Sequence, residues 1–294
     1  MIGVLLAFVS SVMWGGSDFA AGVASRRADV LRVTAVAYLA AGAVSLVVVV
    51  IVPGVWSPEA VWSGVVAGTV SIIGFLAFYL SLVRTAMGVA TAILAASEAV
   101  VPVLVAVAWQ GQSLSLSAWV GVGIAVVGAT VVGLAEGGQP ARATWWSAGL
   151  AAVAGVCFGV AVVALDAAPT DSGMIAPGLE MLLGVVVMPL LVLLVRSSRR
   201  AGRLAAASGL VESTPWQPRS TVLALGAGAL IAGANVVLMF ALRIGPLAAV
   251  GVVVSLYPVT TILLARVLLA ERLNRWQVAG IVAALTGCVL LGIG

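Results

Sequence analysis

The sequence predicts an all-α integral membrane protein whose ten transmembrane helices form an inverted repeat of two five-helix units. Three observations predict this fold: the composition, the spacing of apolar runs, and a match of the chain to itself. Of the 294 residues, 63% are hydrophobic and only 8% are charged, and the mean hydropathy is +1.25. A soluble domain needs about a quarter of its residues charged, so the solvent of this chain is predicted to be lipid.

Ten apolar runs are long enough to cross a bilayer, whose core of about 30 Å requires roughly 20 apolar residues per helix. The first run has no basic segment before it and is interpreted as an uncleaved span rather than a signal peptide. The connection at about 196–220 is the only one long enough for a flexible linker. The runs lie at 2–22, 31–52, 60–83, 88–109, 117–134, 146–165, 173–195, 221–242, 247–269 and 276–293.

The chain matches itself without gaps at an offset of 159 residues. The first spans of the two halves match more weakly and need another offset, which pairs the region of Trp14 with that of Phe158. Because five spans make a half, the second half enters the membrane from the opposite face, as in transporters that work by alternating access. The matched pairs are Gly74 with Gly233, Arg84 with Arg243, Ala90 with Ala249, Leu114 with Leu273, Gly121 with Gly280, Gly128 with Gly287 and Gly133 with Gly292.

Three segments resemble one known family. They are WGGSDF at 14–19, the Ala-Ile-Leu run before Glu98 with Pro102 after it, and SLYPVTTILLARVLLAERLN at 255–274. They look like the EamA-type transporters of the drug/metabolite transporter superfamily. The resemblance implies two EamA-like five-helix repeats, at 1–135 and 145–294, around a central cavity. It also implies a secondary carrier of small metabolites, amino acids or drugs, and it leaves the substrate open.

Glu98 is the acidic residue expected deepest in the membrane. It lies near the middle of its run and matches Tyr257 in the second half. A charge at that depth costs about 2.5 to 3.5 kcal/mol, so it should face a cavity, a partner or water. Pro102 frees the carbonyl of Glu98 and should bend the helix there. Glu98 is therefore predicted to bind substrate or a proton, with a structural hydrogen bond as the alternative.

Asp18 and Trp14 are four residues apart and share one helical face. Together they can offer an aromatic wall and a carboxylate to a cationic group. The alternative is that Trp14 packs in the bundle while Asp18 pairs with Arg26 or Arg27 near the interface.

Further polar residues are expected within spans. Asn235 either bridges helices or binds a polar ligand. The hydroxyls of Tyr79 and Tyr257 are candidate cavity groups, although Tyr79 is close enough to a helix end to be an interfacial residue. Glu180 is expected to have a local role, paired with Asn235 or a backbone group.

The small residues and tryptophans are expected to have structural roles. Gly64 and Gly68 form a GxxxG pattern, and further glycines are spaced at sevens in 117–134 and 276–293, which indicates close helix packing or a dimer face. Seven tryptophans near helix ends are expected to be interfacial anchors, namely Trp56, Trp62, Trp119, Trp145, Trp146, Trp216 and Trp276.

The composition also argues against several kinds of chemistry. There is no histidine, so imidazole metal ligands and His-activated nucleophiles are excluded. No phosphate-binding glycine motif is present, which disfavours an ATP-driven pump. We predict no enzyme activity, no cofactor, no metal and no nucleic acid. The expected partners are the bilayer of the cell membrane and a small-molecule substrate, with possible proton coupling, for a monomer or homodimer.

The leading functional prediction is a secondary transporter that exports small metabolites such as amino acids. A multidrug or cationic-compound efflux carrier is the alternative within transport. A structural membrane scaffold is the alternative outside it, and an acid at mid-membrane disfavours it because a scaffold does not need one.

All 14 basic residues are arginine, and thirteen of them fall on one predicted face while Arg243 alone falls on the other. Positive charge is retained in the cytoplasm, so the count predicts both termini outside. Ten-span relatives are generally pictured with both termini inside. Either this chain departs from that picture or the span count differs by one, and the charge count favours the first.

Overall fold

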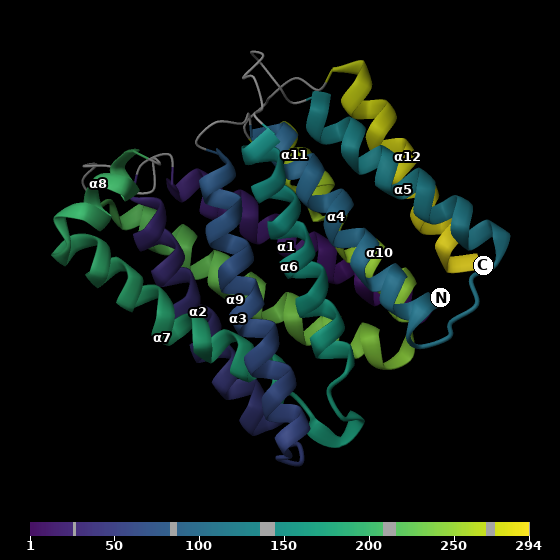
Figure 1. Ribbon diagram of the computed structural model, residues 1–294, viewed down its shortest axis with the longest axis horizontal. Coiled ribbons are helices and arrows are strands. Elements are labelled where there is room, and N and C mark those ends of the chain that lie inside the picture. Colours follow the sequence, from purple (N-terminus) through teal and green to yellow (C-terminus); the bar gives the residue numbers. More distant parts are fainter. Residues whose placement is uncertain (26–27, 83–86, 136–144, 208–215, 269–273, 294) are drawn as a thin grey trace.

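A computed structural model describes residues 1–25, 28–82, 87–135, 145–207, 216–268 and 274–293 (Figure 1). Its regular elements in the described ranges are helices. They are α1 (Ile2–Ser25), α2 (Val30–Ile51), α3 (Pro58–Leu82), α4 (Met87–Ala108), α5 (Leu116–Ala135), α6 (Trp145–Asp166), the short 3₁₀ helix η1 (Thr170–Ser172), α7 (Ile175–Ser197), α8 (Arg199–Ala207), α9 (Pro218–Ile244), α10 (Leu247–Val254), α11 (Tyr257–Leu268) and α12 (Arg275–Ile293).

Eight helical segments of the described chain are long and apolar enough to cross a membrane, counting α10 and α11 together as Leu247–Leu268. Two shorter apolar helices, Leu116–Val131 and Arg275–Leu291, accompany them. The span expected at 247–269 is interrupted, because α10 ends at Val254 and α11 begins at Tyr257. Pro258 accounts for the break, because it has no N–H to donate to the carbonyl of Val254 four residues earlier.

Helices α5 and α12 run antiparallel and pack closely through glycines (Figure 1). A Cβ added to Gly121 would lie 2.9 Å from the carbonyl of Gly287, and one added to Gly128 would lie 2.7 Å from that of Gly280. The self-match exchanges these two contacts, because it pairs Gly121 with Gly280 and Gly128 with Gly287. A two-fold axis that exchanges two antiparallel helices is perpendicular to both of them. The axis that relates the two halves of the chain is therefore perpendicular to α5 and α12.

The same exchange relates contacts elsewhere in the bundle. Helix α1 packs against α9 as α6 packs against α3. Gly233 of α9 faces the end of the Met13 side chain, and its match Gly74 of α3 faces Cys157. Both contacts follow from the pairing of the Trp14 region with that of Phe158. The internal repeat read from the sequence is thus expressed in helix packing.

The GxxxG pattern in α3 serves packing within the chain. A Cβ on Gly64 would lie 2.6 Å from the carbonyl of Ala176, and one on Gly68 would lie 3.1 Å from the Cα of Glu180. Helix α7 therefore rests directly on α3. Of the two roles left open by the sequence, the structure assigns these glycines to internal packing.

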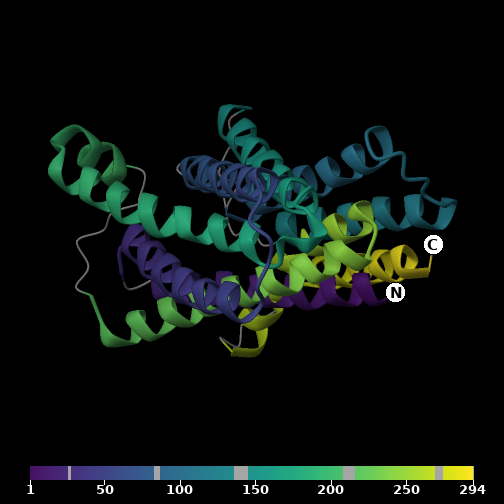
Figure 2. The same cartoon turned by 90° about the horizontal axis from the view of Figure 1, so that it is seen from below.

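Three contacts of arginine side chains distinguish the two sides of the bundle. At the start of α2, Asp29 forms ion pairs with Arg32 at 3.9 Å and with Arg196, near the end of α7, at 3.7 Å. On the opposite side, Arg243 at the end of α9 donates a 2.6 Å hydrogen bond to the carbonyl of Gly173. Both labelled termini lie near each other in Figures 1 and 2, and Gly3 packs against Gly245 on the Arg243 side.

The connection expected to be a flexible linker at 196–220 is partly helical. Helix α8 follows α7 after Ser198, and α9 begins at Pro218. Residues 208–215 lie outside the described ranges. Arg199, Arg200 and Arg203 give α8 a charged face, while Ala205 is buried, which suits a helix lying at a membrane surface.

The outer surface carries the apolar side chains expected of lipid contact. Exposed residues include Leu46, Val50, Leu190 and Leu193 in the middle and later turns of α2 and α7. Six of the seven tryptophans expected as anchors are exposed, namely Trp56, Trp62, Trp119, Trp145, Trp146 and Trp276. Trp216 is half-buried and donates a 2.7 Å hydrogen bond to Thr221.

We predict that Gly128→Ala destabilises the bundle by about 1 to 3 kcal/mol, as overpacking does. The new methyl group would meet the backbone nitrogen of Ala284 at 2.5 Å, and backbone cannot yield as a side chain can. Gly123→Ala is the matched control on the same helix, because no atom lies within 4 Å of its Cβ position. Denaturant unfolding in detergent micelles checks this, and equal losses in both variants would contradict the close α5–α12 contact.

Candidate functional site

Three helices bring together four of the residues selected from the sequence. Trp14 and Asp18 lie on α1, Glu98 lies on α4, and Tyr257 is the first residue of α11. The rings of Trp14 and Tyr257 have centroids 6.5 Å apart and are inclined at 45°. The Asp18 and Glu98 carboxyl groups lie within electrostatic range of each other and of the Tyr257 hydroxyl. We call these four residues the central cluster.

Glu98 is the most enclosed member of the central cluster. Its side chain is 4% exposed, and its Oε2 atom has no hydrogen-bond partner. The indole Nε1 of Trp14 also lacks a partner. Buried polar atoms are normally paired, so this cluster holds one acceptor and one donor available to a ligand.

Asp18 differs from Glu98 in its exposure. It is exposed, whereas its neighbour Ser17 is 1% exposed. Its electrostatic partners belong to α4 and α11, so its carboxyl group lies on the side of α1 that faces these helices. Residues 26–27 lie outside the described ranges, so the alternative pairing of Asp18 with Arg26 or Arg27 stays untested.

Glycines allow the close approach of the helices that carry the cluster. A Cβ on Gly15 of α1 would lie 2.5 Å from the carbonyl of Tyr257, and one on Gly159 of α6 would lie 2.8 Å from the carbonyl of Glu98. Gly15 and Gly159 are related by the same pairing that relates Trp14 to Phe158. Glu98 and Tyr257 therefore occupy equivalent places in the two halves.

Pro102 lies inside helix α4 and does not end it. Helix α4 continues through it to Ala108, and its ring packs against Gly251 of α10. The carbonyl of Glu98, which Pro102 deprives of its helical donor, faces Gly159 of α6. This carbonyl is therefore covered by a helix and does not open polar backbone toward a cavity.

A second polar cluster joins α3, α7 and α9. Glu180 accepts a 3.0 Å hydrogen bond from Ser71 at Oε1 and a 2.8 Å hydrogen bond from the side-chain amide of Asn235 at Oε2. The expected pairing of Glu180 with Asn235 is confirmed. Asn235, selected as a substrate-binding candidate, donates its hydrogen bond to Glu180 here and not to a member of the central cluster.

Ser71 is the residue that sequence reasoning missed. Serine is common in membrane helices and usually bonds within its own helix, so its presence in α3 gave no signal. Tyr79, another candidate, belongs to α3, but its side chain lies outside the described part of the structure.

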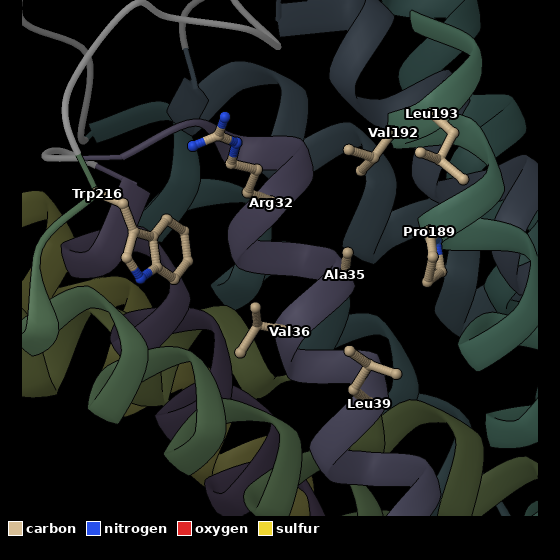
Figure 3. A pocket seen from close by; sticks show the side chains of 8 residues that line it. All are labelled: Arg32, Ala35, Val36, Leu39, Pro189, Val192, Leu193 and Trp216. Carbon is tan, nitrogen blue, oxygen red and sulfur yellow. The ribbon is translucent and has the colours of Figure 1, made fainter. Parts of the chain in front are cut away.

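A groove of about 350 Å³ lies between α2 and α7, away from both clusters (Figure 3). Its walls are mainly aliphatic, with Arg32 and Trp216 as their polar members, so the groove suits an acyl chain better than a polar solute. The lining residues are Arg32, Ala35, Val36, Leu39, Pro189, Val192, Leu193 and Trp216.

Comparison with known families decides the class of protein. The model of the EamA-like transporter family matches residues 1–134 and again residues 145–293. The chain belongs to the EamA-like transporter family. It is therefore a multi-pass membrane protein with the two-repeat architecture of that family, whose members are transporters rather than enzymes.

Solved structures agree on the fold of this EamA-like chain. One, titled "Crystal structure of protein", superposes with a TM-score of 0.73, covering 99% of this chain and 96% of its own, at 19% identity. No curated protein matches the chain. Within the described residues, no group of three or more His, Cys, Asp or Glu side chains could hold a metal ion.

We predict that a cysteine in place of Asp18 reacts with a small charged thiol reagent, because its position is exposed and charged reagents need water. The test uses a Cys157→Ala, Cys288→Ala background, and Ser17→Cys is the adjacent control at a buried position. Labelling is measured by mass spectrometry on protein in lipid. Reaction at position 17 but not 18 would contradict a water-accessible central cluster.

Proposed function

We propose that the chain is a secondary-active exporter of small metabolites such as amino acids in the cell membrane. Ten helices cross the bilayer in this proposal, with α10 and α11 forming one interrupted span and α8 lying at the surface. The two repeats have inverted topology and rock about the central cluster to expose it alternately to each side. The antiparallel contact of α5 and α12 supports this geometry.

The observation that carries the proposal is the chemistry of the central cluster. Two carboxyl groups suit the ammonium group of an amino acid. The Trp14 indole and Tyr257 hydroxyl can donate to its carboxylate. A set of acceptors and donors within one cluster fits a zwitterion.

Efflux of cationic compounds is the second candidate, because Asp18 and Glu98 stand beside two aromatic rings. A hydrophobic cation gains from a carboxylate and from an aromatic face. Such a cation has no carboxylate to accept hydrogen bonds from the Trp14 indole and the Tyr257 hydroxyl. The two candidates separate in one experiment, which compares extracellular amino acids with and without expression beside a toxicity panel of cationic dyes.

We predict that both termini lie outside the cell. The described arginines at helix ends collect on the side of Asp29, with Arg243 on the other, and positive charge is retained in the cytoplasm. A reporter that works only outside the cytoplasm should be active when fused after residue 294, and a cytoplasm-only fluorescent reporter should be dark. The reverse result would place the Arg-rich face outside.

We predict that Glu98→Gln slows transport of the identified substrate by about 10- to 100-fold, the range expected when a hydrogen bond to a charged group is lost. Glutamine is isosteric and neutral, so folding should be preserved. Glu98→Asp should keep activity with a shifted pH optimum, because the charge persists and its reach changes. Initial rates in proteoliposomes across a pH series check both variants.

The exposed Glu59 at the start of α3 provides the matched control for Glu98. Glu59→Gln removes a carboxylate of the same type far from the central cluster and should transport at the wild-type rate. Full activity of the Glu98→Gln variant would remove Glu98 from the mechanism and leave it a structural hydrogen-bond partner.

A further inference from the structure

We propose that Ser71, Glu180 and Asn235 form a proton-binding site, separate from the central cluster, that couples substrate export to the proton gradient. The proposal rests on the transport function proposed above and assigns its coupling ion. Glu180 takes a proton from water on one side of the membrane and returns it to water on the other. The substrate stays with the central cluster.

The site is enclosed and built from three helices. Glu180 is 4% exposed and Asn235 is 2% exposed, and Ser71 is buried. Their side chains are joined by the hydrogen bonds to Glu180 Oε1 and Oε2 described above, at 3.0 and 2.8 Å. A carboxyl group at this depth costs free energy unless it is protonated or paired. The hydrogen bonds from Ser71 and Asn235 provide the pairing, and the site can also hold the protonated form.

The Asn235 amide can serve both protonation states of Glu180. In the observed arrangement its Nδ2 donates to Oε2, which fits a carboxylate, and its Oδ1 atom has no hydrogen-bond partner. When Oε2 carries the proton, a half-turn of the amide lets Oδ1 accept from it. Ser71 donates to Oε1 in both states. No hydrogen bond to Glu180 is lost when the proton arrives or leaves.

The repeat does not preserve this polar cluster. The 159-residue match places Leu230 opposite Ser71 and Leu76 opposite Asn235, and helix α2, the counterpart of α7, contains no acidic residue. Two of the three polar positions are thus apolar in the other half, which has no matching carboxyl group. A helix-bridging hydrogen bond in a membrane contributes only about 0.6 kcal/mol on average, so stability alone is a weak reason to keep three polar groups here.

The cluster also crosses the interface between the repeats. Ser71 belongs to the first half, whereas Glu180 and Asn235 belong to the second. A rocking motion of one half against the other would change the contact between Ser71 and Glu180. Protonation of Glu180 can therefore bias the same motion that exposes the central cluster.

Other titratable groups on the packed helices lie mostly at helix ends. The exception is Tyr38, which packs in the middle of α2 against Gly184, one turn after Glu180. The full set on α2, α3 and α9 is Arg32, Tyr38, Glu59, Tyr79, Arg219 and Arg243, with the side chain of Tyr79 outside the described part.

The decisive test is infrared difference spectroscopy of the full protein in lipid, titrated from about pH 3 to about pH 9, a span that includes the ordinary pKa range of side-chain carboxyls. The wild type should show a buried carboxyl band that changes together with the amide band of Asn235, identified by isotope labelling of asparagine. Glu180→Gln should remove both changes, and Glu59→Gln should remove neither. An unchanged spectrum in the Glu180→Gln variant would overturn the proposal.

Transport assays then separate coupling from substrate binding. The probe is a mixture of radiolabelled neutral amino acids in proteoliposomes. Glu180→Gln should keep exchange of the probe across the membrane and lose its accumulation driven by a pH gradient, whereas Glu98→Gln should slow both by about 10- to 100-fold, as predicted above. Accumulation that persists in Glu180→Gln, or exchange that is lost with it, would overturn the coupling role. If the wild type moves no probe, the proposed substrate class fails while the spectra still decide the proton site.

Discussion

The hydrocarbon core of a bilayer offers no hydrogen-bond partners. Each polar group inside this bundle must therefore bond to another group of the chain or to a bound ligand. The hydroxyls of Ser10 and Ser17 satisfy this constraint by donating to carbonyls of α9. Glu180 satisfies it through two side chains from other helices. Glu98, Trp14 and Asn235 each leave one buried atom without a partner, and two of these three residues belong to the central cluster.

The same solvent determines how the helices associate. Lipid tails are as apolar as leucine, so tight packing of small residues replaces the hydrophobic effect as the main attraction between helices. Glycines at the α5–α12 contact and beneath Glu98 and Tyr257 bring backbones into direct contact. Glycines that match between the repeats make equivalent contacts in the two halves. The repeat therefore specifies a helix bundle with two-fold symmetry.

The polar groups break that symmetry. Glu98 matches a tyrosine, and the residues opposite Ser71 and Asn235 are leucines. A symmetric bundle has equivalent inward- and outward-facing states. Transport in one direction, driven by an ion gradient, must therefore depend on residues that differ between the halves. The two acidic clusters are such groups, and each joins helices from both repeats.

The sequence by itself determined the apolar spans, the repeat and the depth of Glu98, because these depend on composition and periodicity along the chain. It also identified the pairing of Glu180 with Asn235. Only the tertiary structure revealed the role of Ser71 and the separation of Asn235 from the central cluster. These depend on which helix faces meet. Ser71 and Glu180 are 109 positions apart, and in helices that are apolar on all sides no local pattern shows which face a side chain occupies.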